Sequence, residues 1–330
     1  MSTESMYYKQ LEGQGVQCLL CPHQCKIKAG NTGICRVRGN QDGTLVTFNY
    51  GQVASLALDP IEKKPLYHFS PGSFILSAGT YGCNLSCSYC QNYTLAHENP
   101  QTQYVPPETM VMLAERSRES GSIGLAFTYN EPSVWYEYIW DCARLLKERG
   151  QKVVLVTNGY IEARPLEQLL PYIDALNIDV KAFRNDFYKK LCHGTLDPVK
   201  RSVELAARYS HVEITTLIIP EDNDNLEDIE ALASWLASVN RNIPLHLSRY
   251  HPAYNYHRPP TPESTLLAAQ QAAGRYLPFV YLGNVGQGND TRCLNCQALL
   301  IRRTYYRTEL VHFQAGRCSS CGAAADYIVS

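Results

Sequence analysis

Cysteines are the residues whose type and spacing point most directly to chemistry in this sequence. There are 13 of them in 330 residues, and most fall into three groups. Grouped cysteines in a reducing compartment are better candidates for metal ligands than for disulfides. We expect the isolated Cys142 and Cys192 to be small buried apolar residues. The groups are Cys18, Cys21, Cys25 and Cys35; Cys83, Cys87 and Cys90; and Cys293, Cys296, Cys318 and Cys321.

The central group, Cys83-x3-Cys87-x2-Cys90, has a number of thiolates that suits a catalytic iron–sulfur cluster. A fully protein-ligated [4Fe–4S] cluster takes four cysteines. Three cysteines leave one iron open, which a catalytic cluster requires. An ordinary zinc loop is the alternative, and it would need a fourth ligand such as His97.

The C-terminal group consists of two pairs, Cys293-x2-Cys296 and Cys318-x2-Cys321. Two such pairs form a closed tetrahedral site of four thiolates, which is the usual arrangement of structural zinc. We therefore expect a structural zinc ion here, with rubredoxin-like iron as the alternative.

The N-terminal group, Cys18, Cys21, Cys25 and Cys35, leaves the metal open. Its four thiolates suit zinc, or a second [4Fe–4S] cluster that passes electrons to the first. His23 lies inside the loop and could replace one cysteine. We favour zinc.

Composition indicates a folded protein without a membrane segment. The chain is 45% hydrophobic and 18% charged, with a formal net charge of −1. These values argue against disorder and against an overall basic excess for nucleic-acid binding. No apolar run approaches the length of a membrane span, and residues 1–12 do not resemble a secretory leader. We therefore expect a cytoplasmic protein.

The middle of the chain alternates apolar strand patterns with helix patterns. Near-continuous apolar strands indicate a parallel sheet covered by helices. Six strand–helix units and a seventh strand predict an α/β fold, a partial (β/α)6 TIM-like barrel, with a flat doubly wound sheet as the competing architecture. The expected strands are 74–78, 123–129, 153–157, 175–180, 212–219, 245–249 and 279–283, and the expected helices are 107–120, 133–149, 165–172, 198–209, 226–239 and 262–275.

Cysteine-rich segments flank this core. We expect residues 1–70 to form an N-terminal metal-binding extension, with a hairpin near Asp42-Gly43. Residues 71–288 would form the barrel. Residues 289–330 would form a zinc ribbon or rubredoxin-like knuckle domain, in which the metal replaces a missing core.

Polar residues follow several of the expected strands, at the edge where a parallel barrel keeps its active site. Taken singly, each of them suits an ordinary turn or helix start. Their shared placement indicates a site. They are Asn130 and Glu131, Asn158, Asp179 and Lys181, and Tyr250 and His251.

The cysteine loop resembles the signature of the radical S-adenosylmethionine (SAM) superfamily, in which an aromatic residue, here Tyr89, precedes the last cysteine. The resemblance implies an enzyme whose [4Fe–4S] cluster is held by Cys83, Cys87 and Cys90. The open iron would chelate the amino and carboxylate groups of SAM. One electron would then release methionine and a 5′-deoxyadenosyl radical, which abstracts hydrogen from a substrate.

The polar residues resemble those of the activating enzymes of glycyl radical enzymes. Those enzymes have Gly-Gly-Glu-Pro where this chain has Tyr129-Asn130-Glu131-Pro132. By that match Glu131 would bind the SAM amino group, as an anion suits an ammonium. The other cofactor contacts that the resemblance implies are Tyr89, Asn130, Asn158, Asp179, Lys181 and His251.

A closer resemblance covers nearly the whole chain, including Cys18-x2-Cys21-Pro22-His23-x-Cys25 and residues 59–66. These segments are similar to the radical SAM component of the AmmeMemoRadiSam system. The resemblance implies AMMECR-like and Memo-like partner proteins, and we expect an electron donor such as flavodoxin or ferredoxin. A non-catalytic zinc-binding adaptor for the same partners is the rival hypothesis.

The substrate stays open between a glycyl radical protein, an RNA and a small molecule. Charges alternate with aromatic side chains near the C-terminus, as on base-stacking surfaces, although a solvated strand pair explains them equally well. We expect Lys63 and Lys64 to be a surface charge pair. The C-terminal residues in question are Arg302, Arg303, Tyr305, Tyr306 and Arg307.

Overall fold

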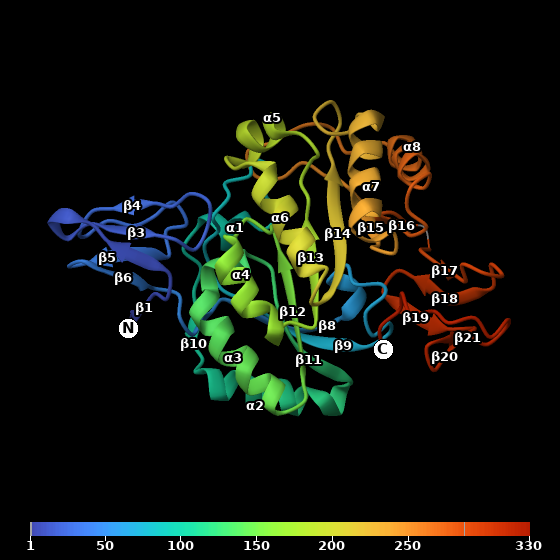
Figure 1. Ribbon diagram of the computed structural model, residues 1–330, viewed down its shortest axis with the longest axis horizontal. Coiled ribbons are helices and arrows are strands. Elements are labelled where there is room, and N and C mark those ends of the chain that lie inside the picture. The colour runs from blue at the N-terminus through green and yellow to red at the C-terminus, as the bar shows by residue number, and fades with distance from the viewer. Residues whose placement is uncertain (1, 287) are drawn as a thin grey trace.

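An eight-stranded sheet forms the centre of the protein in a computed structural model that describes residues 2–286 and 288–330 (Figure 1). Strands β9 to β16 of this sheet run parallel, and β8 is antiparallel to β9 at one edge. The strands are β8 (Ser55–Pro60), β9 (Phe74–Gly79), β11 (Ser122–Phe127), β12 (Lys152–Thr157), β13 (Ala175–Asp179), β14 (His211–Ile218), β15 (Leu245–Arg249) and β16 (Val280–Gly283).

The strand order decides between the two architectures that the sequence allowed. It is β16-β15-β14-β13-β12-β11-β9-β8, in chain order without a reversal. A doubly wound sheet reverses its order at a switch point, so that architecture is excluded. Strands β8 and β16 form the two edges, which makes the sheet a partial barrel.

Helices follow the strands and bury one apolar stripe each. In the helix after β11, for example, Tyr138, Ile139, Cys142 and Leu146 are buried at helical spacing. Cys142 is thus a buried apolar residue, as predicted. The helices are α2 (Pro107–Arg116), α3 (Tyr136–Glu148), α4 (Ala163–Leu169), α6 (Leu196–Ala206), α7 (Leu226–Asn240) and α8 (Glu263–Ala273).

The expected strands and helices of the core all occur, with ends within a few residues of those predicted. Several short elements were not expected. They are α1 (Tyr93–His97), α5 (Asn185–Phe187), a π-helix (Tyr188–Cys192), the strands β7 (Gln52–Val53) and β10 (Gln103–Tyr104), and the 3-10 helices Glu12–Gln14 and Ile61–Lys63. The 3-10 helices Ser117–Ser120, Pro132–Trp135 and Leu170–Tyr172 lie at the ends of expected helices.

The N-terminal segment folds into two small antiparallel sheets beside the barrel (Figure 1). The predicted hairpin is confirmed, because Asp42 and Gly43 link two paired strands with φ values of 50° and 88°. Two positive φ values in a two-residue loop suit a type I′ turn. The strands are β1 (Thr3–Glu4), β5 (Arg38–Gln41) and β6 (Thr44–Thr47) in one sheet, and β2 (Tyr8–Gln10), β3 (Val16–Cys18) and β4 (Lys26–Ile27) in the other.

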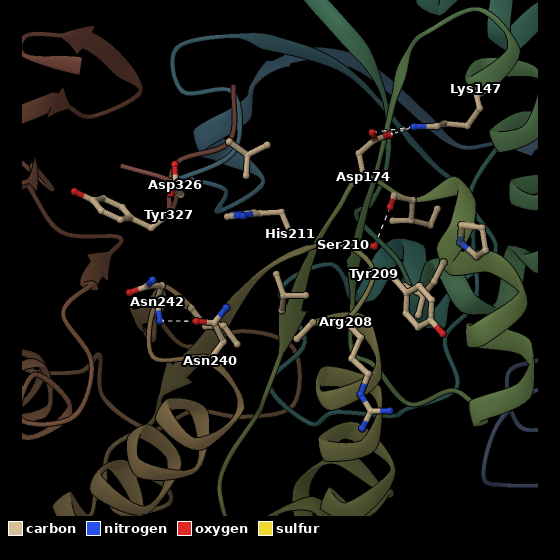
Figure 2. A pocket seen from close by; sticks show the side chains of 17 residues that line it. Lys147, Asp174, Arg208, Tyr209, Ser210, His211, Asn240, Asn242, Asp326 and Tyr327 are labelled. Carbon is tan, nitrogen blue, oxygen red and sulfur yellow. Dashed lines mark hydrogen bonds and ion pairs between the residues drawn. The ribbon is translucent and has the colours of Figure 1, made fainter. Parts of the chain in front are cut away.

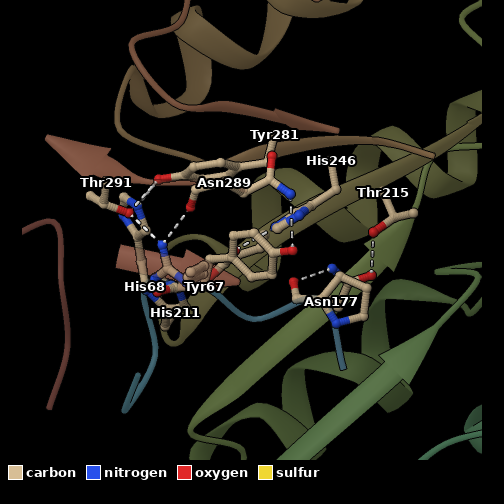
Figure 3. Close-up of polar contacts among 12 residues, drawn as sticks. Tyr67, His68, Asn177, His211, Thr215, His246, Tyr281, Asn289 and Thr291 are labelled. Atoms are coloured by element: carbon tan, nitrogen blue, oxygen red, sulfur yellow. Dashed lines mark hydrogen bonds and ion pairs between the residues drawn. The ribbon is translucent and has the colours of Figure 1, made fainter. Parts of the chain in front are cut away.

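The C-terminal segment docks at the amino ends of the parallel strands. Arg303 is buried there, donates to Tyr67 O (2.5 Å) and Thr291 Oγ1 (2.7 Å), and lies over the Tyr67 ring. Figure 3 shows Tyr67 and Thr291 among the polar contacts of this region. Arg303 is therefore not part of an exposed base-stacking surface. The strands of this segment are β17 (Thr291–Arg292), β18 (Leu299–Thr304), β19 (Arg307–Leu310), β20 (Phe313–Gln314) and β21 (Arg317–Cys318).

A buried carboxylate organises the same end of the barrel. Glu213 accepts hydrogen bonds from His68 N (2.7 Å), His211 Nε2 (2.9 Å) and His246 Nε2 (2.6 Å). His68 in turn contacts Tyr327 O through Nδ1 (3.0 Å). The C-terminal segment is thus fixed to the barrel by polar contacts that are shielded from water.

The division of the chain at residues 70 and 288 stays a prediction. Strand β8 precedes residue 70 and pairs with β9 along its whole length, so part of the N-terminal extension belongs to the barrel sheet. None of the helices in the described part of the chain combines the length and the apolar character needed to cross a bilayer.

Candidate active site

The cysteine loop begins where β9 ends, at the carboxyl end of the parallel strands. Gly82 introduces it with a φ of +89°. A Cβ atom on Gly82 would lie 2.5 Å from Val37 Cγ1 and 2.9 Å from Cys35 O. The loop therefore requires glycine here for both conformation and space. The N-terminal segment packs directly against the residue that precedes Cys83.

Two N–H groups point at the Cys83 sulfur. Leu85 N lies 3.4 Å from Cys83 Sγ, and Asn158 Nδ2 lies 3.7 Å from it. N–H donors around a cluster sulfur are one of the means by which a protein tunes an iron–sulfur centre. The predicted residues Cys83 and Asn158 are thus brought together.

Asn84 connects the loop to the end of β12. Its Oδ1 accepts a hydrogen bond from Asn158 Nδ2 (2.9 Å), and its Nδ2 donates to Tyr160 O (2.6 Å). Asn84 is buried, so both bonds are shielded from water. The sequence prediction missed this residue, because an asparagine between loop cysteines is equally typical of a turn.

Glu131 is buried and accepts three hydrogen bonds from the protein. Its Oε1 receives Ser133 N (2.8 Å) and Thr157 Oγ1 (2.7 Å), and its Oε2 receives Asn158 N (2.8 Å). Burial raises the pKa of Glu131, and these hydrogen bonds oppose the rise. These contacts hold the Glu131 carboxylate in one orientation at the end of β11.

Asn130 holds the start of the loop. Its Oδ1 accepts from Thr80 N (3.1 Å), and its Nδ2 donates to Gly82 O (2.9 Å). In this geometry both ends of the amide are used by the protein. Asn130 replaces the second glycine of the activating-enzyme motif with a side chain that ties two strand ends together.

Asp179 and Lys181 form an ion pair of 2.7 Å at the end of β13. Although burial acts in the opposite direction, Asp179 and the Cys87 thiolate raise the pKa of Lys181. Lys181 is therefore a cation close to the cysteine loop. Both side chains of the pair stay partly exposed, at 32% and 18%, so a ligand can reach them.

Tyr89 points away from solvent and contacts Cys192. Its OH lies 3.2 Å from Cys192 Sγ, and both residues are buried. A hydrogen bond from Cys192 lowers the pKa of Cys87 against the effect of burial, and Lys181 adds to the lowering. Cys192 is thus buried as expected, but its thiol has polar partners next to the loop.

His251 follows β15 and is exposed, while Tyr250 is buried and donates to Tyr256 O (2.8 Å). His97 stacks on Tyr254, with ring centroids 5.5 Å apart. The structure thus places His251 at the carboxyl end of the strands, on the open side of the site.

The prediction for Lys64 was wrong. Its side chain is only 2% exposed, pairs with Asp59 (2.8 Å) and lies over the Tyr129 ring. Lys63, which is 47% exposed, also pairs with Asp59. Lys64 is buried because the segment after β8 folds against the barrel, where Pro65 O accepts from Asn177 Nδ2.

The C-terminal cysteines form a compact group. Their sulfur atoms all lie within 4.8 Å of one another, with Cys293–Cys321 and Cys296–Cys318 separations of 3.8 Å. Tetrahedral zinc with Zn–S bonds of about 2.3 Å places its sulfurs about 3.8 Å apart. The group can therefore hold a single metal ion of this kind.

Figure 2 shows a groove at the amino ends of the strands. The cysteine loop follows the carboxyl end of β9 and therefore lies at the other end of the barrel. The lining of the groove includes His211, Asp174 and Tyr327. Asp174 is already used, because it pairs with Lys147 (2.9 Å) and accepts from Val153 N (2.9 Å). Among the described residues, the groove therefore offers no candidate for a second catalytic site.

The chain is similar to known proteins along most of its length. Residues 78–236 match the model of the radical SAM superfamily. An uncharacterized protein of Methanocaldococcus jannaschii, MJ0808, is 41% identical over 99% of both chains. The pyruvate formate-lyase-activating enzyme of Clostridium pasteurianum is 27% identical over 52% of this chain and 72% of its own length. Streptococcus suis SuiB bound to S-adenosylmethionine has a similar fold, with a TM-score of 0.51, 14% identity, and coverage of 68% of this chain and 52% of that chain.

The chain therefore belongs to the radical SAM superfamily and is an enzyme. Membership implies a [4Fe–4S] cluster and SAM as cofactors. The residues at the barrel end fit these groups, because three thiols and an open side lie beside a carboxylate and a lysine. The hypothesis of a non-catalytic adaptor has no support.

Proposed function

We propose that this chain is the radical SAM enzyme of an AmmeMemoRadiSam system and acts by hydrogen abstraction. Cys83, Cys87 and Cys90 would hold the [4Fe–4S] cluster. When bound, the cluster supplies the electron that splits SAM into methionine and a 5′-deoxyadenosyl radical. The substrate would enter at the carboxyl end of the parallel strands, where the cysteine loop lies.

The observation that carries this proposal is the set of hydrogen bonds that ties the cysteine loop to two neighbouring strand ends. Asn158 contacts Asn84 and Cys83, and it also donates its backbone N–H to Glu131. These contacts fix the loop relative to the ends of β11 and β12. A plain zinc loop has no use for such a buried link to a carboxylate.

SAM would bind between this network and the Asp179–Lys181 pair. Lys181 would attract the carboxylate of SAM, and the Glu131 carboxylate would attract its ammonium group. His251 and Asp179 would face the ribose. Asn130 and Tyr89 would act by holding the loop, because their polar atoms already bond within the protein.

For the substrate we favour a protein over RNA. Relatives at 27% identity include a pyruvate formate-lyase-activating enzyme. The C-terminal segment, which suggested RNA, docks at the far end of the barrel and buries Arg303. AMMECR-like and Memo-like proteins would be the partners, with flavodoxin or ferredoxin as electron donor. The C-terminal cysteines would hold structural zinc.

The proposal is tested by electron paramagnetic resonance of the reconstituted, reduced protein with and without SAM. We expect SAM to change the spectrum of the barrel cluster, because it binds the open iron. Cys87→Ala should abolish this change, whereas Cys142→Ala, a buried cysteine in α3, should keep it. A wild-type spectrum that SAM does not alter would contradict the proposal.

A further inference from the structure

The four N-terminal cysteines lie around one point of the small sheets. Cys18 N donates to Cys25 O (3.0 Å), which places Cys18, at the end of β3, beside Cys25, which directly precedes β4. A Cβ atom on Gly33 would lie 3.5 Å from Cys25 Sγ, and Gly33 precedes Cys35 by two residues. Cys21 starts the tight turn between Cys18 and Cys25. The four cysteines are thus placed as the ligands of one metal centre would be.

The sulfur spacing in this group differs from that of the C-terminal group. Among the described residues, only the C-terminal cysteines bring three or more ligand atoms within 4.8 Å of one another. All four N-terminal cysteines are among these residues, so no three of their sulfurs lie that close together. One zinc ion would require sulfur separations of about 3.8 Å. The N-terminal group is too wide for that.

The barrel cysteines supply an internal comparison. Cys83, Cys87 and Cys90, to which the proposed function assigns a [4Fe–4S] cluster, also fail to meet the 4.8 Å limit. In such a cluster each thiolate binds a different iron, so the sulfurs are spread over a larger tetrahedron than around one ion. The N-terminal group shares with the barrel group that its sulfurs are spaced more widely than those of the C-terminal site.

Arg38 gives an independent indication of an anionic centre. Its side chain is only 2% exposed and pairs with Glu137 (2.5 Å) through one nitrogen. Its Nε and Nη1 are buried and have no hydrogen-bond partner in the described part of the chain. Gly33 N donates to Arg38 O (2.8 Å), and Gly33 itself lies against Cys25, so Arg38 is a neighbour of this cysteine group. Two free N–H groups suit the sulfides of a cluster.

The N-terminal group is also connected to the barrel loop. His23 lies between Cys21 and Cys25, and its Nε2 is 2.7 Å from Asn84 O, next to Cys83. On the other side, Cys35 O packs against Gly82. His23 is thus engaged by the loop rather than by the N-terminal cysteines. The two cysteine groups are joined by short contacts on both sides of Cys83.

From this geometry we infer that Cys18, Cys21, Cys25 and Cys35 bind a second [4Fe–4S] cluster and not zinc. The inference rests on the proposed function for the comparison with the barrel group and for the role of this cluster, which would store one electron beside the barrel cluster. The expectation of zinc, drawn from the sequence, is thereby replaced. Four thiolates close the coordination of this cluster, so it would not bind SAM.

Metal counting on the intact wild-type protein tests the inference without any substitution. After anaerobic reconstitution with iron and sulfide we expect about eight irons and one zinc per chain, two cubanes and one structural ion. Mössbauer spectroscopy should assign all of the iron to [4Fe–4S] clusters. About four irons and two zincs per chain would overturn the inference.

Two sets of variants separate this site from the active site. Cys83→Ala, Cys87→Ala and Cys90→Ala combined should keep half of the iron, and Cys18→Ala with Cys25→Ala should keep the other half, with zinc unchanged in both. The reduced wild type should show spin coupling between the clusters that is absent from each variant. Full loss of iron in the barrel variant would overturn the second cluster, whereas unchanged iron in that variant would instead contradict the proposed function.

Discussion

Asn158 donates a hydrogen bond of 2.9 Å to Asn84 although 74 residues separate the two in the chain. The contact joins the end of β12 to the loop that carries Cys83. Through its backbone, Asn158 also donates to Glu131. One residue thus fixes both the cluster loop and the carboxylate that the activating-enzyme resemblance assigns to SAM.

Replacing Asn158 should loosen the cluster loop. Asn158→Ala leaves the buried Asn84 Oδ1 without its donor, which costs about 1–3 kcal/mol of folding free energy. We expect a lower iron content after reconstitution and a lower urea midpoint. Asn242→Ala, at an exposed site, is the matched control and should change neither. Full iron retention in Asn158→Ala would argue against the positioning role.

Lys181 should contribute to SAM affinity without affecting the cluster. Lys181→Gln removes the cation paired with Asp179 and one charge-assisted hydrogen bond, so the Kd for SAM should rise by about tenfold or more. Titration of the reduced cluster signal with SAM measures this. Lys190→Gln, exposed in the nearby π-helix, should bind SAM like the wild type. An unchanged Kd in Lys181→Gln would exclude the contact.

Gly82 should tolerate no side chain. Gly82→Ala combines a φ of +89° with a Cβ only 2.5 Å from Val37 Cγ1, and we expect a loss of about 1–3 kcal/mol of stability. Gly150→Ala isolates the backbone effect, because Gly150 has a φ of +65° and no described atom lies within 4 Å of the place its Cβ would take. Urea unfolding of both variants should show the larger loss for Gly82→Ala. Equal losses would show that the packing against Val37 is unimportant.

The polar contacts at the amino ends of the strands should make the protein sensitive to acid. Burial lowers the pKa of His68 to about 3 from its usual 6.5, so the folded state prefers the neutral ring. The resulting stability is present above pH 6.5 and is lost as the pH falls toward 3. One such proton changes the free energy of unfolding by about 1.4 kcal/mol per pH unit.

His68→Gln tests this sensitivity. Urea unfolding at pH 7 and pH 5 should show a smaller pH-dependent loss in the variant than in the wild type, although the variant is less stable at pH 7. His257→Gln, at an exposed position, should keep the wild-type dependence. Parallel pH profiles for wild type and His68→Gln would contradict the assignment.

Much of the fold could be predicted from the sequence because most of its parallel strands contain apolar runs, as in β11 and β12. Strand β8 was missed because it lies at the sheet edge, where alternate residues are more exposed. Strand order could not be predicted from periodicity, since it depends on how the strand–helix units pack against one another. The structure shows that the strands follow one another in chain order.

The candidate site was predictable in its residue types but not in its contacts. Polar residues after strand ends indicated Glu131 and Lys181. The sequence could not indicate that Asn84 would meet Asn158, because their contact depends on the relative position of two loops. Lys64 beside Lys63 looked like a surface pair, and its burial results from the packing of the segment after β8. The local sequence pattern predicts neither the contact between Asn84 and Asn158 nor the burial of Lys64.

The most direct test of the central claim is the release of 5′-deoxyadenosine. The protein, purified and reconstituted without oxygen, would be reduced, mixed with SAM and assayed by chromatography beside Cys87→Ala. We predict 5′-deoxyadenosine in stoichiometric or greater amount from the wild type and none from the variant. A wild-type protein with an intact barrel cluster that releases no 5′-deoxyadenosine, or as much as Cys87→Ala, would contradict radical SAM chemistry at Cys83, Cys87 and Cys90.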